Sequence, residues 1–470
     1  MIAPGVLVAY ACSVVLGAAL WFALAGLPRR PGERFAAAGY ATLLGLLASG
    51  MLVALRRDAA GADTFIATLP LIGAAIVLLA GLGWRRARRA QPSAPVAMTT
   101  GTRLPPWAWL LFAAIAVRFA FVLDEAFLRP VFVWDAWNAW SLKAKTWFEL
   151  GQVRFLDPTS WWRDSDPSAH TALAWRYPEL LSRIELWLAS AAGAWNEGAV
   201  ATAWPLLWLA LVAGCAGQWR ALGVSRNACV VLAYLLASLP LLSVHAALAG
   251  YADLWVAATL TFAVLAWLRW LRDGDRAQLL LATCCTGALP LLKFEGAVWA
   301  LLLTGLAILV QVPPRWRRIG LIAAVFGALL AVAASWALQL PWLALVRDVL
   351  SGVAAGDNDV SRFVAATAFF KGLFAQNNWH LLWPLLVACL IWQRERLRDR
   401  REIGLLALLL GAGLAALFCL FVFTPAAKWA TSETAMNRLV LQWAPLALSL
   451  IGLLLRDVRV PARRPDALPH

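Results

Sequence analysis

Charged residues are scarce in this chain, and their scarcity is the first indication of its class. Only 14% of its 470 residues are Asp, Glu, Lys or Arg, whereas 62% are hydrophobic, and the mean hydropathy is +0.71. A soluble fold of this length cannot bury so much apolar surface, so the composition indicates an integral membrane protein that crosses the bilayer many times. A large soluble domain is not expected either.

Several familiar site patterns are also missing. The seven cysteines lie in apolar segments without a CxxC pair or a Cys/His ligand spacing, so we expect neither a disulfide framework nor a zinc site. Without a Walker A or a Rossmann glycine pattern, nothing indicates nucleotide binding. The first apolar stretch lacks a basic n-region and a cleavage site, so we expect a retained span rather than a signal peptide. We expect no cofactor, and the need for a divalent metal stays open.

The hydrophobic runs predict an all-α, polytopic transmembrane bundle of about 13 spans. The expected spans are 2–27, 36–55, 65–84, 107–123, 199–218, 228–247, 253–271, 277–291, 296–312, 319–341, 379–393, 403–423 and 438–455. The pair 277–291 and 296–312 is interpreted as two helices joined by a tight turn, with a single broken helix as the alternative. We divide the chain into three additional N-terminal helices (1–106), a core (107–455) and a cytoplasmic tail (456–470).

Arginine clusters set the expected orientation. The net charge of +15 does not predict a nucleic-acid partner, because the arginines fall in short clusters between hydrophobic segments. More than half of the 41 Lys and Arg residues lie in alternate loops and in the tail. The positive-inside rule makes that face cytoplasmic. The long loops 124–198 and 342–378 then lie outside, on the periplasmic side of a bacterial inner membrane.

The first long outer loop contains two amphipathic patterns. In 178–192, apolar residues form one helical stripe opposite Glu179 and Arg183, so we expect an interfacial helix on the outer membrane surface rather than a span. Counting it as a span would place the later arginine clusters outside. In 136–150, Trp137, Trp140 and Trp147 recur at helical steps and predict a second interfacial helix.

The polar stretch 132–150 carries the first candidate for chemistry. Asp135 lies between Trp134 and Trp137, where partial desolvation would make its carboxylate a better general base. The structural alternative is that Asp135 caps a helix beginning at Ala136. Asp124 and Glu125 are alternative acids, because they follow the preceding span more closely.

Other polar residues at the outer ends of spans are candidate substrate or phosphate contacts. Each has a structural alternative, such as snorkelling to lipid head groups, helix capping or mutual neutralisation within a turn. A metal site at His170 with Asp164 and Asp166 is disfavoured, because the spacing matches no established ligand pattern. The candidates are Lys143, Lys145, Lys293, Glu295, Arg438, Asp253, His170 and Tyr177.

Together these short motifs resemble the GT-C superfamily of polytopic glycosyltransferases, which includes protein O-mannosyltransferases and lipid A aminoarabinose transferases. The resemblance covers about 107–455. It rests on the following residues: Asp135, Trp140, Ala144 and Gly151; His170, Tyr177 and Pro178; Asp253; Lys293, Glu295 and Gly296; and Arg438. The chain departs from the family in two ways. The family's acidic residue usually comes very soon after the first core span, where this chain has Asp124-Glu125 rather than Asp135, and three helices precede the core.

The resemblance implies transfer of a sugar from a polyprenyl-phosphate donor to a lipid, glycan or protein acceptor at the outer face. Asp135 would then be the base, and cations would stabilise the departing phosphate. A transporter or lipid flippase is the competing class, and a noncatalytic membrane scaffold is a third. No internal repeat is visible, and the candidate polar residues lie at the ends of spans, which favours the enzyme.

Overall fold

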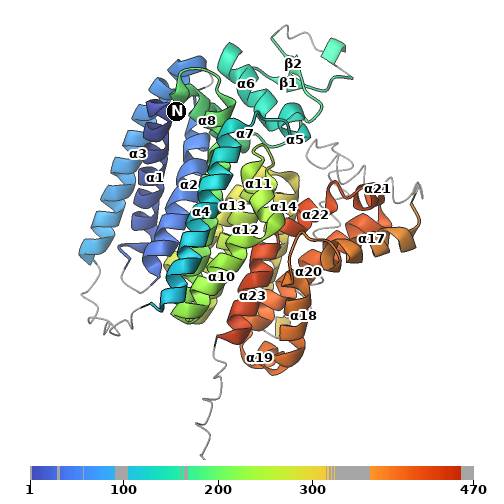
Figure 1. Ribbon diagram of the computed structural model, residues 1–470. Coiled ribbons are helices and arrows are strands. Elements are labelled where there is room, and N and C mark those ends of the chain that lie inside the picture. The colour runs from blue at the N-terminus through green and yellow to red at the C-terminus, as the bar shows by residue number, and fades with distance from the viewer. Residues whose placement is uncertain are drawn as a thin grey trace, which may run out of the picture.

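Upright helices dominate the protein (Figure 1). The structure is a computed structural model that describes residues 3–28, 32–56, 58–89, 104–159, 161–163, 168–313, 315–316, 319, 322 and 360–456. Within these residues, nine helices are long and apolar enough to cross a membrane. The protein is therefore an all-α helical bundle whose helices fit a membrane-spanning role.

The N-terminal half contains four long helices, a loop rich in short elements, and a fifth long helix. The long helices are α1 (Pro4–Ala25), α2 (Glu33–Val53), α3 (Gly61–Arg89), α4 (Pro106–Leu128) and α9 (Ala203–Ala221). The short elements are α5 (Trp134–Asn138), α6 (Trp140–Leu150), β1 (Phe155–Leu156), the 3-10 helix η1 (Trp161–Arg163), β2 (His170–Thr171), α7 (Leu180–Ala192) and α8 (Glu197–Ala201). The two strands pair in parallel over two residues each.

The C-terminal half completes the bundle. Its helices are α10 (Arg226–Ser238), α11 (Pro240–Ala247), α12 (Asp253–Asp273), α13 (Arg276–Leu292), α14 (Phe294–Gln311), α17 (Arg362–Phe374), α18 (Leu382–Trp392), α19 (Arg394–Asp399), α20 (Arg401–Phe423), α21 (Ala427–Thr431), α22 (Met436–Leu441) and α23 (Ala444–Leu455). Helices α10 and α11 are bent by 60° where Pro240 begins α11. Pro240 removes a backbone donor at the bend.

Nine of the expected spans correspond to the nine long apolar helical segments within the described residues, whereas the expected span 228–247 is the bent pair α10–α11 and two others correspond to shorter helices. Helices α13 and α18 have 17 and 11 residues. At about 1.5 Å per residue, both are shorter than a hydrocarbon core of about 30 Å. The expected span 319–341 lies almost wholly outside the described residues, as do most of the expected tail 456–470 and residues 342–359 of the second outer loop.

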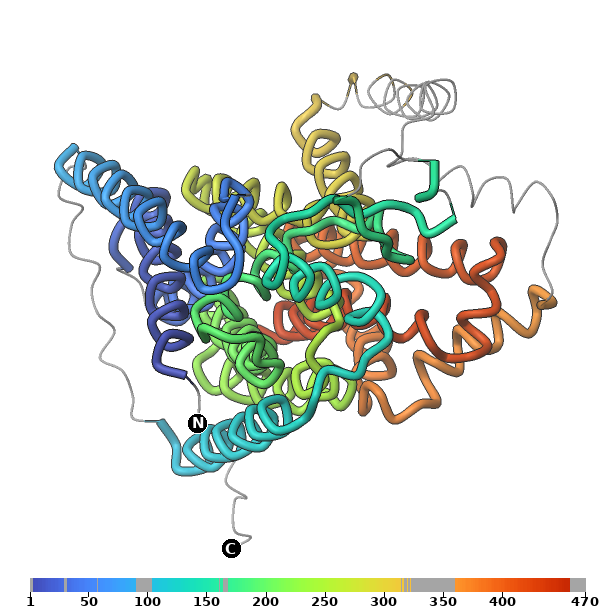
Figure 2. The backbone as a smooth tube through the Cα atoms, turned by 90° about the horizontal axis from the view of Figure 1, so that it is seen from above, coloured from blue at the N-terminus to red at the C-terminus, as the bar shows by residue number. Residues whose placement is uncertain are grey.

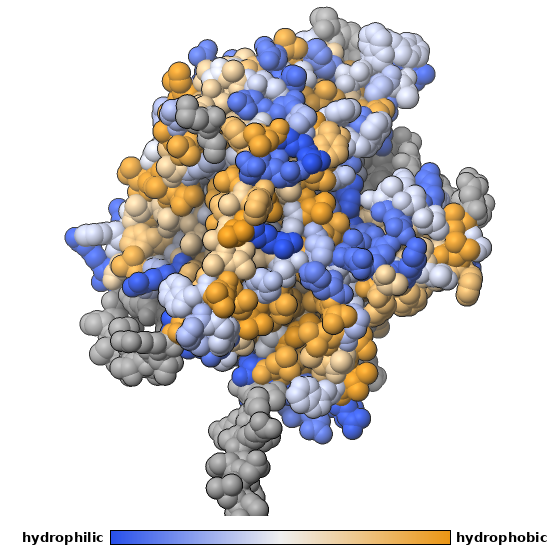
Figure 3. Space-filling model, viewed as in Figure 1, coloured by the Kyte–Doolittle hydropathy of each residue, from blue (hydrophilic) through white to orange (hydrophobic). Residues whose placement is uncertain are grey.

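Burial separates central helices from lipid-facing ones. The apolar window is 89% buried in α12 and in the segment Met436–Leu455, but only 11% in α3 and 17% in α4 and α14. The outer helices expose apolar side chains such as Val77, Leu110 and Leu301. Hydrophobic residues make up much of the visible flank in Figure 3. An apolar flank around a buried core is the pattern expected of a bundle in lipid.

Arginines tie together the loops at one end of the bundle. Helix α19 and the end of α23 lie at this lower end in Figure 1, whereas α5 to α8 lie at the opposite, upper end. Guanidinium groups near a helix C-terminus complement its partial negative charge. The contacts are Arg272 to Ala221 O (2.6 Å), Arg456 to Leu222 O (3.0 Å), Arg396 to Leu454 O (2.9 Å) and Arg401 to Val310 O (3.0 Å).

The first outer loop differs from the expectation in two respects. Residues 136–150 do not form one helix, because the backbone breaks at Ala139 between α5 and α6. Helix α7 is not a surface helix: Figure 2 shows the loop crossing the upper end, and α7 packs against α1, α2, α3 and α6. Ten of its 13 residues are buried. The apolar stripe was correctly identified, but protein covers the opposite face as well.

Candidate functional site

Four distant segments meet in one polar cluster at the upper end. Asp253, the first residue of α12, is completely buried. Its carboxylate accepts a hydrogen bond from Lys293 Nζ at 2.9 Å and from Arg438 Nε and Nη2 at 3.0 and 2.8 Å. We call the set Asp135, Asp253, Lys293, Glu295, Arg438 and Gln442 the Asp253 network. Buried charges require partners of this kind, because an isolated charge loses its hydration.

Arg438 joins the buried part of the network to the surface. Its Nη2 also donates to Asp135 Oδ2, and the guanidinium carbon lies 4.1 Å from the centroid of the Tyr251 ring. The Asp135 side chain is 22% exposed and that of Arg438 16%. The Nη1 group of Arg438 makes no hydrogen bond within the described part of the chain. The site therefore contains two partly exposed carboxylates, Asp135 and Glu295, and a partly exposed guanidinium.

Asp135 does not cap its helix, contrary to the structural alternative. Helix α5 begins at Trp134, its N-cap residue is Val133, and no side chain caps it. The Asp135 carboxylate instead pairs with Arg438. Asp253 is likewise not a cap, since the N-cap of α12 is Ala252. In both cases the acidic side chain is used for a long-range ion pair.

The turn between α13 and α14 positions two more charges. Lys293 alone separates the two helices, and its Nζ lies 3.2 Å from Glu295 Oε1. A Cβ on Gly296 would lie 2.2 Å from Leu289 O, so only glycine allows α14 to start so close to α13. The helices pack against each other, as expected for a tight turn rather than one broken helix.

Gln442 belongs to the network and Trp299 binds it from outside. Neither residue was predicted from the sequence. Gln442 Nε2 donates to Asp253 Oδ1 at 2.8 Å, and Trp299 Nε1 donates to Gln442 Oε1 at 2.5 Å. A signal was present, because Gln442 follows Arg438 by four residues and therefore lies on the same helical face. With Gln442, Asp253 Oδ1 accepts from two side chains, while Oδ2 accepts from two nitrogens of Arg438.

Helix α5 is anchored beside the network by a small apolar cluster. Val131, Val133 and Ala136 pack with Leu248 and Tyr251. Trp137 Nε1 donates to Val131 O at 2.7 Å, and this bond leaves the Trp137 ring exposed above the helix. These contacts position Asp135 beside Arg438.

Tyr177 lies close to the network, and Lys143 binds the backbone of the loop segment that contains Tyr177. The Tyr177 ring packs against Trp140 at 5.5 Å and Phe294 at 4.9 Å. Burial, followed by the charge of Glu295, raises the pKa of Tyr177 to about 12. Lys143 Nζ donates to Trp175 O and Tyr177 O at 3.0 and 2.9 Å. Burial lowers the pKa of Lys143 to about 8.

The remaining candidates lie outside the network. Lys145 is exposed on α6, and His170 lies in β2 opposite Phe155. Asp124 is exposed in the last turns of α4, where its neighbour Glu125 pairs with Arg129. Asp164 and Asp166 lie outside the described residues. Among the residues the structure describes, no group of three or more His, Cys, Asp or Glu could hold a metal ion.

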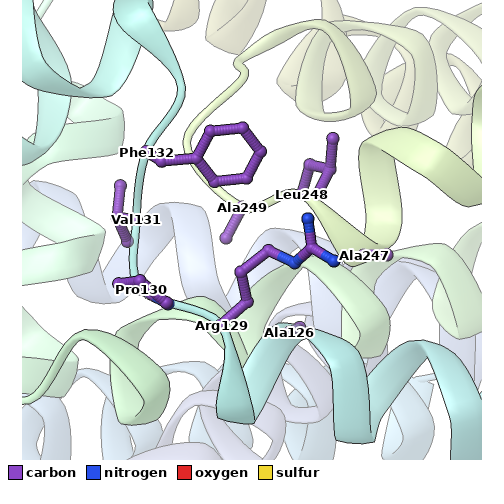
Figure 4. A pocket seen from close by; sticks show the side chains of 8 residues that line it. All are labelled: Ala126, Arg129, Pro130, Val131, Phe132, Ala247, Leu248 and Ala249. Carbon is purple, nitrogen blue, oxygen red and sulfur yellow. The ribbon is translucent and has the colours of Figure 1, made fainter.

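A small hollow lies between the end of α4 and the turn that follows α11. It has a volume of about 10 Å³, about the room of one water molecule, and is lined by Ala126, Arg129, Pro130, Val131, Phe132, Ala247, Leu248 and Ala249. Figure 4 shows Arg129 extending across it toward Leu248, with the Phe132 ring above. The hollow is smaller than a typical ligand pocket of about 300–1,000 Å³.

The formal charges of the network do not cancel. Three carboxylates (Asp135, Asp253 and Glu295) face two cations (Lys293 and Arg438), which leaves one negative charge in excess. The partly exposed carboxylate can accept a proton from one ligand, and the fixed guanidinium beside it can hold an anionic group of another.

Comparisons with protein-family models, with curated proteins and with solved structures find no match for this chain.

Proposed function

We propose that this protein is a GT-C-type membrane glycosyltransferase that uses a polyprenyl-phosphate sugar donor. The observation that carries the proposal is the convergence of Asp135, Asp253, Lys293, Glu295 and Arg438 on one site. Each was a candidate on separate grounds, and they come from chain segments up to 303 residues apart. A network at the ends of spans lies where a lipid-phosphate head group and a polar acceptor can meet.

Asp135 supplies the base in this mechanism. Its carboxylate takes the proton from an acceptor hydroxyl while the acceptor oxygen forms a bond to the anomeric carbon. The bond from that carbon to the phosphate oxygen breaks, and its electron pair leaves with the polyprenyl phosphate. Asp135 then releases the proton to water. Of the three carboxylates, Asp253 is fully buried and pairs with two cations, so it is unsuited to this step.

Arg438 is the phosphate contact in the proposed site. Its Nη1 group, together with the Nη2 hydrogen that now binds Asp135, can hold two phosphate oxygens, which stabilises the negative charge that develops on the leaving group. Lys293 is 4% exposed and engaged by Asp253 and Glu295, so it acts mainly by fixing Asp253. Lys143 is used by two backbone carbonyls and supports Tyr177 instead.

The membrane arrangement follows from the same proposal. The arginine-linked lower end faces the cytoplasm, and the upper end faces the periplasm of a bacterial inner membrane. Helices α13 and α18 and the bent pair α10–α11 bring the nine long helices to 12 spans, and the expected span 319–341, which lies outside the described residues, would be the thirteenth. The acceptor is a lipid, a glycan or a protein that reaches the outer face.

Transfer from a labelled polyprenyl-phosphate sugar by the purified protein tests the proposal. A new labelled glycoconjugate, formed together with free polyprenyl phosphate, is expected when a cell-envelope extract supplies the acceptor. The Arg438→Gln protein, purified and assayed in the same way, is the control. Absence of any covalent product across several donor sugars would overturn the proposal.

A transporter is the second candidate, and the bent pair α10–α11 favours it. Helices broken within the membrane often line substrate paths in transporters. The bend of 60° at Pro240 lies beside α9 and α12, close to the site. A transporter would move the labelled lipid or sugar across a vesicle membrane without changing its covalent structure, so product analysis separates the two candidates.

A further inference from the structure

The guanidinium of Arg438 is held in a fixed position from below. Asp253 receives two of its N–H groups and is itself completely buried. Gln442 and Lys293 fix the Asp253 carboxylate in turn, at 2.8 and 2.9 Å. Tyr251 packs against the guanidinium at 4.1 Å. A side chain held this way cannot follow a ligand without breaking the buried network.

Asp135 is the exchangeable partner of Arg438. It makes its ion pair to Nη2 alone, it is partly exposed, and it lies on a helix of five residues that ends at the break at Ala139. Separating Asp135 from Arg438 would expose a carboxylate to water, whereas separating Asp253 would strand a buried charge. The second change costs several kcal/mol more than the first.

Charge balance requires such an exchange when an anion arrives. The Asp253 network already has one negative charge in excess. A phosphate placed on Arg438 would lie beside Asp135 and be repelled, because two anions sharing one cation destabilise each other. The phosphate and Asp135 therefore compete for the same guanidinium edge.

We propose that the donor phosphate displaces Asp135 from Arg438, so that the base is freed only when the donor is bound. This inference rests on the proposed glycosyl transfer and adds its regulation. A carboxylate released from its arginine and placed near a phosphate accepts a proton more readily. The donor binds first, and the acceptor hydroxyl is activated afterwards. In the absence of donor, Asp135 stays neutralised.

Binding of a short-chain polyprenyl monophosphate to wild-type and Asp135→Asn protein tests this competition. Asn keeps the size of the side chain but removes the competing charge, so we expect the variant to bind the phosphate about tenfold more tightly or better. The same variant is expected to lose sugar transfer. An increase in affinity together with a loss of turnover is not the outcome of a merely structural role.

Three controls complete the experiment. Asp124→Asn removes an exposed carboxylate outside the network and should leave the affinity unchanged, and Arg438→Lys, which keeps the charge but not the fork, should weaken binding. Inorganic phosphate distinguishes a general anion site from a lipid-phosphate site, which should prefer the lipid. Equal or weaker binding by Asp135→Asn, when the wild type binds, would overturn the competition alone. Absence of binding to the wild type would overturn the proposed function together with this inference.

Discussion

Asp253 is the buried carboxylate on which both cations of the site converge. It is fully buried and balances Lys293 and Arg438, both of which are nearly or largely shielded from solvent. The sequence indicated Asp253 as a candidate substrate or phosphate contact at the start of a span, with a cap as the alternative. Its actual partners are 40 and 185 residues away, and helical periodicity carries no information about such pairings.

The first prediction concerns Asp253→Asn. Removing one partner of a buried ion pair leaves the other charge uncompensated, so we expect the free energy of unfolding to fall by roughly 3–5 kcal/mol. Asp135→Asn, at the exposed side of Arg438, should cost roughly 1 kcal/mol or less. Thermal unfolding of both variants in the same detergent measures the difference. Equal losses of stability for the two variants would contradict the assignment of Asp253 as the buried partner of Arg438 and Lys293.

Glu185 on α7 gives a second prediction, on pH. Burial raises the pKa of this carboxyl from 4.5 to about 8. The folded protein therefore keeps a proton on Glu185 that the unfolded chain releases above pH 4.5. Stability should fall by roughly 1.4 kcal/mol per pH unit as the pH rises between these two values.

Glu185→Gln resembles the protonated form and should remove this pH dependence. We expect the variant to gain stability relative to the wild type as the pH rises from 5 to 8, and to match it near pH 5. Melting temperatures over that range, with Glu149→Gln at an exposed position of α6 as the control, test this. A wild type with the same pH profile as Glu185→Gln would show that Glu185 is ionised in the fold.

At the scale of elements, glycine contacts explain how closely α1 and α2 pack against each other. A Cβ on Gly45 of α2 would lie 1.8 Å from Ser13 O, and one on Gly17 of α1 would lie 1.8 Å from Ala41 O. Small residues allow helix backbones in membranes to approach closely, so that dispersion contacts and hydrogen bonds hold them together. Ser13 and Ser49 Oγ atoms lie 2.8 Å apart in this interface.

Gly45→Ala is therefore expected to destabilise the protein by roughly 1–3 kcal/mol, because the helices must move apart. Gly81→Ala in α3 is the matched control, since a Cβ there meets nothing within 4 Å. An alanine in an open helical position should be neutral or raise stability by up to about 1 kcal/mol. Comparing the two melting temperatures measures the contact. A neutral Gly45→Ala variant would mean that the helices are less tightly packed.

Helix α7 shows that the sequence predicts a helix and its apolar face but not what packs around it. Its apolar stripe and the pair of Arg183 with Glu179 at 2.6 Å were both anticipated. Its burial was not, because α1, α2 and α3 cover it, and a periodic pattern does not tell which helices from elsewhere will pack on a face. The break at Ala139 was missed for a related reason: α5 is fixed by contacts to residues 248–251 rather than by its own propensity.

At the scale of the whole molecule, nine of the 13 expected spans correspond to long apolar helices, and the arginine clusters of the sequence lie at the lower end as expected. Hydrophobic length and charge clusters are local properties, and the bilayer imposes strong rules on both. The site followed only in part. Its charged members were identified singly, whereas Gln442 and Trp299 carry no charge and are recognisable only from their hydrogen bonds to Asp253.

Orientation gives a fourth prediction. In a background with the exposed Cys284 and Cys419 replaced by Ser, Lys145→Cys tests the upper end and Asp399→Cys the lower end. We expect a membrane-impermeant maleimide to label the Lys145→Cys protein in intact spheroplasts, and to label the Asp399→Cys protein only after permeabilisation. The reverse pattern would place the Asp253 network on the cytoplasmic side.

The most direct test is the rate of sugar transfer from a polyprenyl-phosphate donor by Asp135→Asn beside Asp124→Asn. Both variants remove one carboxylate at the upper end, but only Asp135 pairs with Arg438. We expect Asp135→Asn to lower turnover by about 100-fold or more, as loss of a general base does, while Asp124→Asn stays close to the wild type. Transfer at the wild-type rate by Asp135→Asn would contradict a catalytic role for Asp135.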